Sequence, residues 1–314
     1  MPIFQQGSLN ATALVVPDLY VQIVPPQNLV LNGVPTNVLG VVGTASWGPV
    51  SQPVIVATMA DYAGSYGPVI VRQYDMGTQV ATAVQQGAQN FRCVRVTDGT
   101  DTAAQVAIPN TTFTFTALYT GSLGNQVMLA LNPGSQVNTW CFTAVLPGLQ
   151  PEVYNNIGGT GAAFWTTLAI AVNQGQGAQR GPSQLVIAST GGAIAIPSSF
   201  ATTLGAGTAG SDGVTNVAAG NLVGSDVPPR EGMYALRGQG CGIALLADAD
   251  DTTQWTTQAA FGLQEGVYMI LTGPPGDTIQ NAINVKAQVG LDSYAAKLMF
   301  GDWLWWSDQV NNVV

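Results

Sequence analysis

The chain has 314 residues, of which only 8% are charged and none is histidine, and its formal net charge at pH 7 is −9. Soluble domains usually carry about 25% charged residues, so this composition is typical of a protein whose surface is largely occupied by partners. Eight Lys and Arg residues leave little charge for phosphates, which argues against nucleic acid as a partner. The lack of histidine excludes Ser-His-Asp and Cys-His catalysis and removes the commonest metal ligand.

The first distinctive stretch, Leu19–Ala60, contains no charged residue. Prolines break it into short apolar strands instead of a membrane span: Pro25, Pro26, Pro35, Pro49 and Pro53. The first of these strands consists of Leu19, Tyr20, Val21, Gln22, Ile23 and Val24. A solvated strand edge normally carries Lys or Pro, which prevent pairing with other chains. Because this strand carries no charge, we expect it to pair with another subunit.

A strand, helix and strand follow, which indicates an α/β unit. The segment Thr58-Met-Ala-Asp61 fits a capping box and predicts a short helix that ends at Gly67. An apolar stripe predicts a second helix over Met76–Gln86. The segment Phe91–Val96 then alternates in the manner of a half-buried strand.

The composition changes at Thr102, since only Glu152 and Arg180 are charged between Thr102 and Ser211. Alternating apolar residues and Gly or Pro-Gly turns predict a β-meander or sandwich that ends near Thr203. Its expected elements are strands at Thr111–Thr120, Val127–Leu131, Thr139–Leu146 and Gln184–Ser189, and a helix at Ala163–Asn173.

The last third returns to an α/β pattern. Gly242–Ala247, Val267–Leu271 and Ala295–Phe300 are near-continuous apolar runs, which are typical of strands buried on both faces. Helical stretches at about 252–264 and 277–288 separate them, so we expect a parallel sheet with right-handed crossovers.

Three tryptophans, Trp303, Trp305 and Trp306, crowd the end of the sequence. They would expose a large apolar patch, so we expect another surface to cover them. The three cysteines, Cys93, Cys141 and Cys241, form no C-x-x-C pair, and we expect buried thiols in a reducing cytoplasm. The amino terminus lacks the basic and apolar regions of a secretory signal.

Two motifs have both a chemical and a structural interpretation. Gly205–Gly210 matches G-x-G-x-x-G, but without a leading strand and a following amphipathic helix we interpret it as an interdomain loop. Asp248, Asp250 and Asp251 follow a buried strand and could bind a divalent cation or cap the helix that begins near Thr252. We favour capping.

A Ser-Lys catalytic pair would need Lys286 or Lys297, and both fall on stretches where a lysine has an ordinary surface role. We therefore expect no catalytic residue, no cofactor and no metal ion.

Eight short motifs remain, and their order along the chain is informative. They are V-V-P-D-L-Y-V (15–21), V-L-G-V-V-G-T-A-S-W-G-P (38–49), D-M-G-T (75–78), F-R-C-V-R-V-T (91–97), Y-T-G-S-L-G-N (119–125), G-M-Y-A-L-R (232–237), L-T-G-P-P-G (271–276) and G-D-W (301–303). This ordered set covers most of residues 12–308 and resembles the tail sheath proteins of contractile-tailed bacteriophages.

The resemblance implies a structural, non-enzymatic polymer. Sheath subunits stack as rings around a tail tube, and contraction drives that tube through the host envelope. The implied partners are further copies of the chain, the tail tube protein, the baseplate and the tail terminator, with the host membrane involved only indirectly. The implied location is the virion tail, after assembly in the host cytoplasm.

The implied fold is a subtilisin-like α/β scaffold with a mostly parallel sheet and no protease chemistry, carrying an inserted β-rich sandwich or barrel. We expect an amino-terminal arm at 1–25, a first α/β part at 26–103, the outward-facing insert at 104–203 and a second α/β part at 204–314. Sheath chains normally continue into a carboxy-terminal domain that faces the tube, and we expect that domain to be missing here.

Sheath subunits also exchange terminal arms that add strands to neighbouring sheets. Leu19–Val24, Trp303, Trp305 and Trp306 are therefore the expected inter-subunit contacts. Three alternatives stay open: the sheath of a phage-derived bacteriocin or another contractile injection system, a static shell or surface-lattice protein, and a subtilisin-like hydrolase.

Overall fold

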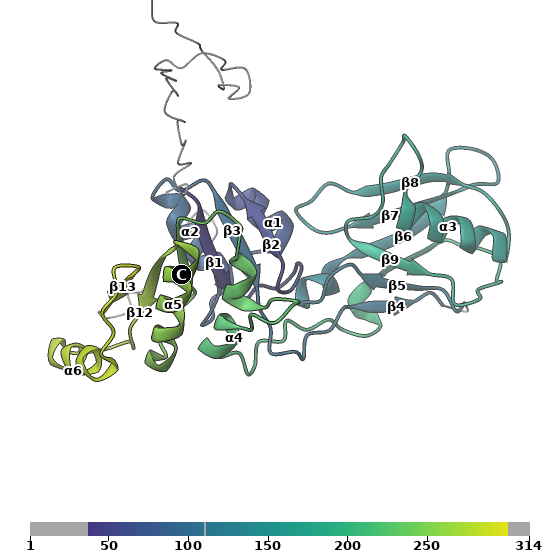
Figure 1. Cartoon of the computed structure of the whole chain (residues 1–314). Coiled ribbons are helices and arrows are strands. Elements are labelled where there is room, and N and C mark those ends of the chain that lie inside the picture. The colour runs from purple at the N-terminus through teal and green to yellow at the C-terminus, as the bar shows by residue number, and fades with distance from the viewer. Residues whose placement is uncertain (1–36, 110, 301–314) are drawn as a thin grey trace, which may run out of the picture. The chain divides into compact units, whose positions relative to one another are not determined.

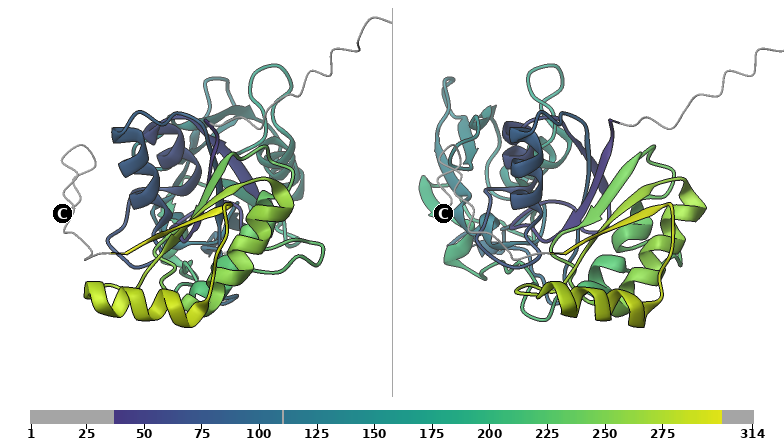
Figure 2. Two further views of the ribbon diagram at one scale, coloured as in Figure 1. Left: turned by 60° about the vertical axis from the view of Figure 1, so that its left-hand side comes forward. Right: turned by 90° about the vertical axis from the view of Figure 1, so that its left-hand side faces the viewer.

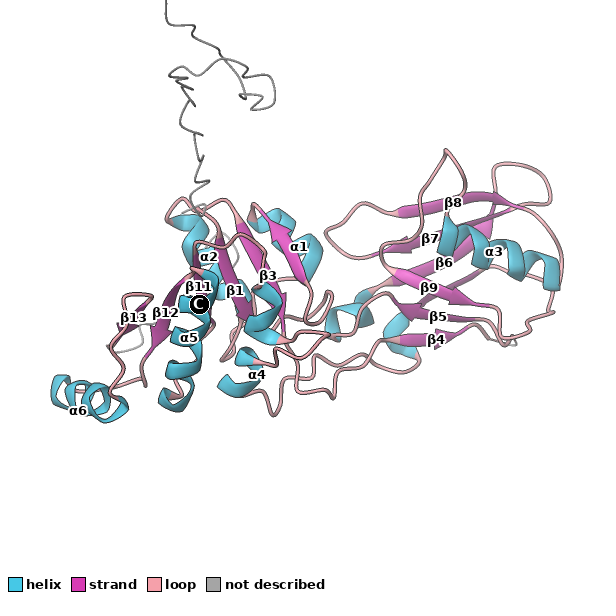
Figure 3. Ribbon diagram, in the orientation of Figure 1, coloured by secondary structure: helices cyan, strands magenta, loops and turns pink. Residues whose placement is uncertain are grey.

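The computed structural model of the chain describes residues 37–109 and 111–300 (Figure 1). The expected contact residues Leu19–Val24, Trp303, Trp305 and Trp306 lie outside the described residues. Within these ranges the chain is a mixed α/β protein with one mostly parallel sheet and two antiparallel sheets, as Figure 3 shows by secondary structure. The boundaries expected for the four regions remain a prediction.

The mostly parallel sheet has six strands. In spatial order they are β13 (Ala296–Met299), β12 (Tyr268–Thr272), β11 (Ile243–Leu246), β1 (Leu39–Gly43), β3 (Phe91–Arg95) and β2 (Pro53–Val56). Every neighbouring pair is parallel except β2 and β3, which are antiparallel at one edge. The parallel sheet expected from the apolar runs is therefore confirmed.

Helices pack on both faces of this sheet (Figure 2). Successive residues of a strand point to opposite faces. Val41 of β1 accordingly packs in the cluster under the first two helices, and Val42 packs in the cluster on the other face. The first face carries α1 (Met59–Tyr66) and α2 (Met76–Gln85), and the second carries α4 (Ala219–Val223), η4 (Gly232–Leu236), η5 (Thr252–Gln254), α5 (Trp255–Glu265) and, at its margin, α6 (Ile279–Val289).

The capping box predicted at Thr58 is confirmed. The Thr58 hydroxyl accepts a hydrogen bond from the Asp61 backbone N–H at 3.2 Å, and the Asp61 carboxylate accepts one from the Thr58 N–H at 3.0 Å. The helix ends at Gly67 as expected. Sequence reasoning overlooked the cap of α2, where the Asp75 carboxylate accepts a hydrogen bond from the Thr78 N–H at 2.8 Å.

The burial expected for three strands was wrong. One of them is β12, which is not buried on both faces, because Met269 and Leu271 are fully buried while Tyr268 is 40% exposed. The strand at Phe91 is not half-buried, because β3 lies between β1 and β2 and both Val94 and Arg95 are fully buried. The strand at Ala296 is not buried on both faces either, because β13 forms the other edge of the sheet and leaves Lys297 and Met299 exposed.

The two antiparallel sheets form a separate β-rich region with its own core. One sheet has the order β10-β6-β7-β8 and the other β4-β5-β9, and α3 packs against β8 and β9. The meander, the helix and the strand before Ser189 were predicted, whereas β4, β8 and β10 were not. Their bounds are β4 (Gln105–Ala107), β5 (Thr114–Ala117), η2 (Ser122–Gln126), β6 (Met128–Pro133), β7 (Trp140–Val145), β8 (Glu152–Ile157), α3 (Ala162–Gln174), β9 (Val186–Ser189), β10 (Phe200–Thr203) and η3 (Leu204–Ala206).

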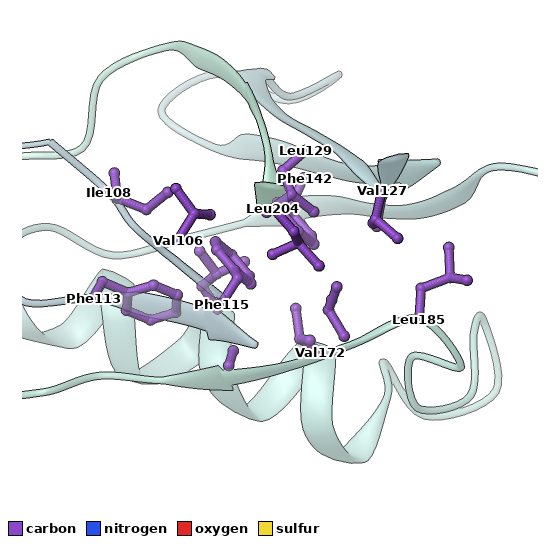
Figure 4. Close-up of a cluster of buried hydrophobic side chains, with 14 of the residues drawn as sticks. Val106, Ile108, Phe113, Phe115, Val127, Leu129, Phe142, Val172, Leu185 and Leu204 are labelled. Atoms are coloured by element: carbon purple, nitrogen blue, oxygen red, sulfur yellow. The ribbon is translucent and has the colours of Figure 1, made fainter. Parts of the chain in front are cut away.

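Aromatic and aliphatic side chains fill this second core (Figure 4). Phe115 and Phe142 come from the two different sheets and stack with ring centroids 4.7 Å apart. Val172 reaches the same cluster from α3. Each buried side chain of this kind stabilises the fold by roughly 2–3 kcal/mol, so the β-rich region has a substantial core of its own.

Candidate functional site

Of the three acidic residues after β11, Asp251 acts as a helix cap. The Asp251 carboxylate accepts a hydrogen bond from the Thr253 N–H at 2.9 Å and so caps η5, which confirms the capping interpretation. The Asp248 carboxylate instead accepts one from the Gln79 side chain at 2.9 Å. Among the described residues, no group of three or more Cys, Asp or Glu side chains is placed to hold a metal ion.

The glycine-rich segment Gly205–Gly210 is a loop that runs alongside β4. Gln105 and Thr208 exchange backbone hydrogen bonds of 2.9 and 2.7 Å. A Cβ built on Gly207 would lie 2.3 Å from the Gln105 carbonyl oxygen, so the close approach of these two backbone segments requires glycine at position 207. The segment is a loop between the β-rich region and the six-stranded sheet, and its glycines serve chain packing.

The three cysteines are free thiols, but the expectation that all three are buried was wrong for Cys141. Cys93 and Cys241 are buried, and burial raises the pKa of Cys93 strongly and that of Cys241 to about 11. Cys141 is partly exposed, because its strand β7 places it beside the β-rich core and not within it.

None of the helices among the described residues combines the length and apolarity that a membrane span requires.

The feature that joins the two regions is a buried guanidinium at the end of β3. Arg95 is fully buried, and its Nη1 donates hydrogen bonds of 2.8 Å to the carbonyl oxygens of both Gly48 and Thr120. Its Nη2 donates to the Asp212 carbonyl oxygen at 3.2 Å. These acceptors belong to the loop after β1, to the loop between β5 and η2 in the β-rich region, and to the segment that returns from that region. We call this group, together with Arg72, the Arg95 junction.

An ion pair holds the returning segment in place. Arg72 Nη1 lies 2.6 Å from the Asp212 carboxylate, which also accepts a hydrogen bond from the Ser122 N–H at 2.6 Å. Burial alone would raise the pKa of Asp212, but the hydrogen bonds from Ser122 and Arg72 outweigh burial and lower that pKa. Asp212 is therefore a stable anion beside the two arginines.

Arg72 also reaches toward the sheet. Its Nε lies 3.8 Å from the carboxylate of Asp75, the capping residue of α2. Burial raises the pKa of Asp75 to about 6, and the bonds from Thr78 and the charge of Arg72 only partly oppose that effect. Burial likewise lowers the pKa of Arg95, with Asp101 and Asp212 acting in the opposite direction. An arginine nevertheless stays protonated.

Close backbone packing completes the junction. A Cβ on Gly121 would lie 2.1 Å from the Ser46 carbonyl oxygen, so the backbone segments at Gly121 and Ser46 are in direct contact. Trp47 follows β1 in sequence but is buried in the core of the β-rich region, where it meets Tyr119 edge to face at 5.5 Å. Backbone and side-chain contacts therefore join the two regions directly.

Gly48, Arg95 and Thr120 each lie in one of the eight sequence motifs, but the sequence predicted no role for Arg95. The available signal was its position inside the apolar run Phe91–Val96. A charge in a buried strand needs fixed partners because its desolvation is costly.

The edges of the six-stranded sheet are the second candidate surface. β2 and β13 each pair with one neighbouring strand among the described residues. Ile55 on β2 is 66% exposed and Met299 on β13 is 49% exposed. Pro53 on β2 and Lys297 on β13 discourage pairing, but the other residues of these two edge strands are apolar and can accept an added strand from another chain.

Together these features define an α/β protein in which a mostly parallel sheet carries a β-rich region on a buried, hydrogen-bonded junction. In fold, the chain is similar to the sheath tail protein of Listeria innocua, with a TM-score of 0.52 and 16% identity over 77% of this chain and 49% of that one. A sheath tail protein of Desulfitobacterium hafniense gives a TM-score of 0.49 and 17% identity over 82% of this chain and 53% of that one.

The chain therefore spans about half the length of these two solved structures. No protein-family model and no curated protein matches the sequence.

Proposed function

We propose that this chain is a structural subunit of a contractile phage tail sheath, a homopolymer that surrounds a tail tube. The observation that carries the proposal is the fold similarity to the Listeria innocua sheath tail protein over 77% of this chain. The ordered motifs and the charge-poor composition support it independently, since 8% charged residues suit a protein with a largely covered surface.

In this proposal contraction is mechanical. It requires an extended state that is metastable and subunit contacts that improve in the contracted state. The Arg95 junction supports this mechanism, because a region held by buried hydrogen bonds and an ion pair moves with the sheet that carries it. Movement is then concentrated between subunits, and contraction drives the tube through the host envelope to eject the genome.

The proposed contact to another subunit is the strand Leu19–Val24, within an arm of residues 1–25. Edge strands β2 and β13 are candidate acceptors, because each has one free side among the described residues. The α/β parts at 26–103 and 204–314 would form the body of the subunit, and the insert at 104–203 would face outward. Further proposed partners are the tail tube protein, the baseplate and the tail terminator. The proposed location is the virion tail, after assembly in the host cytoplasm.

Trp303, Trp305 and Trp306 complete the proposed contact set. We propose that another subunit covers them in the assembled protein. A bacteriocin sheath would use the same contacts and mechanism.

We further propose that the α/β part is a subtilisin-like scaffold without protease chemistry. The mostly parallel sheet and the histidine-free sequence support this view. A fluorescent covalent serine probe tests it, and we expect no labelling above that of the heat-denatured protein. Stoichiometric labelling of a single serine in the folded chain would favour a hydrolase instead.

The polymer itself is tested by sedimentation of the complete protein and of a variant that lacks residues 1–25. We expect the complete protein to sediment as large assemblies, and the shortened variant to remain a folded monomer by circular dichroism. Normal polymerisation of the shortened variant would refute the role of the arm. A complete protein that stays monomeric at all concentrations would refute the polymer.

A further inference from the structure

One edge of the three-stranded sheet in the β-rich region lies along β9. The strand order is β4-β5-β9, so β5 pairs with one side of β9, and no strand pairs with its other side among the described residues. Alternate residues of a strand direct their backbone groups to the same side. In β9, Val186 and Ala188 direct theirs away from β5, because their N–H groups bond to side chains outside the sheet. Such an edge is a template for pairing with another chain.

A side chain of α3 bonds to both backbone groups of Ala188. Asn173 Nδ2 donates a hydrogen bond to the Ala188 carbonyl oxygen at 2.8 Å, and the Ala188 N–H donates one to Asn173 Oδ1 at 2.9 Å. A residue of a neighbouring strand would exchange the same pair of bonds, so the carboxamide takes the place of a strand. The Val186 N–H donates to Ser183 Oγ at 3.0 Å. Both outward N–H groups therefore have side-chain partners.

The residues that usually guard an edge strand are absent from β9. The edge strands of the six-stranded sheet carry Pro53 and Lys297, whereas β9 reads Val-Ile-Ala-Ser. The surrounding segment, 184–190, contains neither charge nor proline and is rich in β-forming residues, which is typical of segments that pair with identical copies. The only charged residues of the β-rich region, Glu152 and Arg180, lie 3.1 Å apart in an ion pair. The Asn173 carboxamide therefore does at this edge what charge does at others.

The opposite edge of the same sheet is closed as well. Gln105 of β4 exchanges backbone hydrogen bonds of 2.9 and 2.7 Å with Thr208. The Asn125 carboxamide holds this loop, because it exchanges hydrogen bonds of 3.0 and 2.7 Å with the two backbone groups of Gly210. The β-rich region therefore uses the same device twice, an asparagine carboxamide that bonds to both backbone groups of one residue.

We propose that Asn173 keeps the β9 edge closed to other copies of the chain, and that β9 of a second copy pairs with this edge once the carboxamide is removed. Two identical β9 strands can pair antiparallel about a two-fold axis, so that both copies offer the same residues. No like charges meet in such a pair, because the strand is uncharged. The closed edge leaves contacts between copies to other surfaces of the chain. The assignment does not depend on the proposed sheath function.

Hydrogen–deuterium exchange of the full chain, resolved to single amides by mass spectrometry at low and at high protein concentration, tests the proposal. Asn173→Ala removes both bonds and keeps a strong helix former in α3. At low concentration we expect the Ala188 amide to exchange about tenfold faster, which corresponds to the loss of one hydrogen bond. At high concentration this acceleration should disappear, because the strand of a second copy pairs with the edge. In the wild type, exchange in β9 should not depend on concentration, whether or not the chain polymerises.

Two further variants of α3 separate closure of the edge from the simple loss of a bond. Asn173→Asp also loses the donor to the Ala188 carbonyl oxygen, but it places a charge at the edge, and charge discourages pairing. We expect exchange in β9 of this variant to be the same at both concentrations. Gln174→Ala removes the next, exposed amide of α3 and should match the wild type. Wild-type exchange in Asn173→Ala at low concentration, or concentration-dependent protection of β9 in Asn173→Asp, would overturn the proposal.

A second substitution identifies the paired strand. Ile187 on β9 and Val153 on β8 are 47% and 44% exposed, and they lie on edge strands of the two different sheets. In the Asn173→Ala background we expect Ile187→Lys to keep exchange fast at high concentration, and Val153→Lys to leave the concentration dependence in place. Equal effects of the two lysines, or fast exchange in Asn173→Ala at every concentration, would contradict pairing through β9. Circular dichroism confirms that each variant is folded.

Discussion

Replacing Arg95 by methionine should uncouple the β-rich region from the six-stranded sheet. Methionine keeps most of the apolar stem and removes the guanidinium. The carbonyl oxygens of Gly48, Thr120 and Asp212 then lose the donors they now have at 2.8, 2.8 and 3.2 Å. The Thr120 hydroxyl oxygen, at 3.1 Å, loses the same donor but can turn toward water.

An unsatisfied buried acceptor costs about 1–3 kcal/mol. The bond to Gly48 is buried, whereas those to Thr120 and Asp212 are partly buried, so water can replace part of what is lost there. A full loss at Gly48 and partial losses at the other two carbonyl oxygens add up to about 3–5 kcal/mol, and we expect Arg95→Met to lower the free energy of unfolding by this amount.

Urea unfolding followed by circular dichroism and by tryptophan fluorescence measures this loss. Arg92→Met is the matched control, because Arg92 lies on the same strand and bonds only to its neighbours Asn90 and Phe91 in the described structure. We expect the control to change stability by less than about 1 kcal/mol. The reasoning is refuted if both variants lose the same amount, or if Arg95→Met retains wild-type stability.

Two further predictions concern the surroundings of the junction. The pKa of Asp75 is raised from 3.8 to about 6 in the folded chain. Protonated Asp75 therefore adds to the free energy of unfolding fully below about pH 4, and this stabilisation is lost as the pH rises through 6. Two pKa units correspond to about 3 kcal/mol, and Asp75→Asn should remove up to that much pH dependence, as measured by urea unfolding at pH 4 to 7; an unchanged pH profile would contradict this. Gly121→Ala should destabilise the chain by several kcal/mol, because its Cβ meets Ser46 at 2.1 Å, whereas Gly99→Ala, also at positive φ but in open space, should cost only about 1–3 kcal/mol. Similar melting temperatures for these two glycine variants would show that the contact with Ser46 is not tight.

The sequence predicted the secondary structure best where a local rule applies. The capping box at Thr58, the stripe of α2 and the apolar run at Ile243 each depend on neighbouring residues, and each is confirmed. Burial was predicted less well, because it depends on the position of a strand in the sheet. The apolar run at Ala296 could not reveal that β13 is an edge strand.

The junction could not be predicted for a related reason. Arg95, Gly48, Thr120 and Asp212 are distant in sequence and meet only after the β-rich region is inserted between β3 and β11. A buried arginine in an apolar strand indicates that partners exist but does not identify them.

Electron microscopy of the assembled complete protein tests the proposed function most directly. A contractile sheath predicts hollow tubes in two forms, one longer and narrower and one shorter and wider, with the β-rich region on the outside and moving as one body with its sheet. Flat lattices, closed shells or tubes of a single length under all conditions would contradict a contractile sheath.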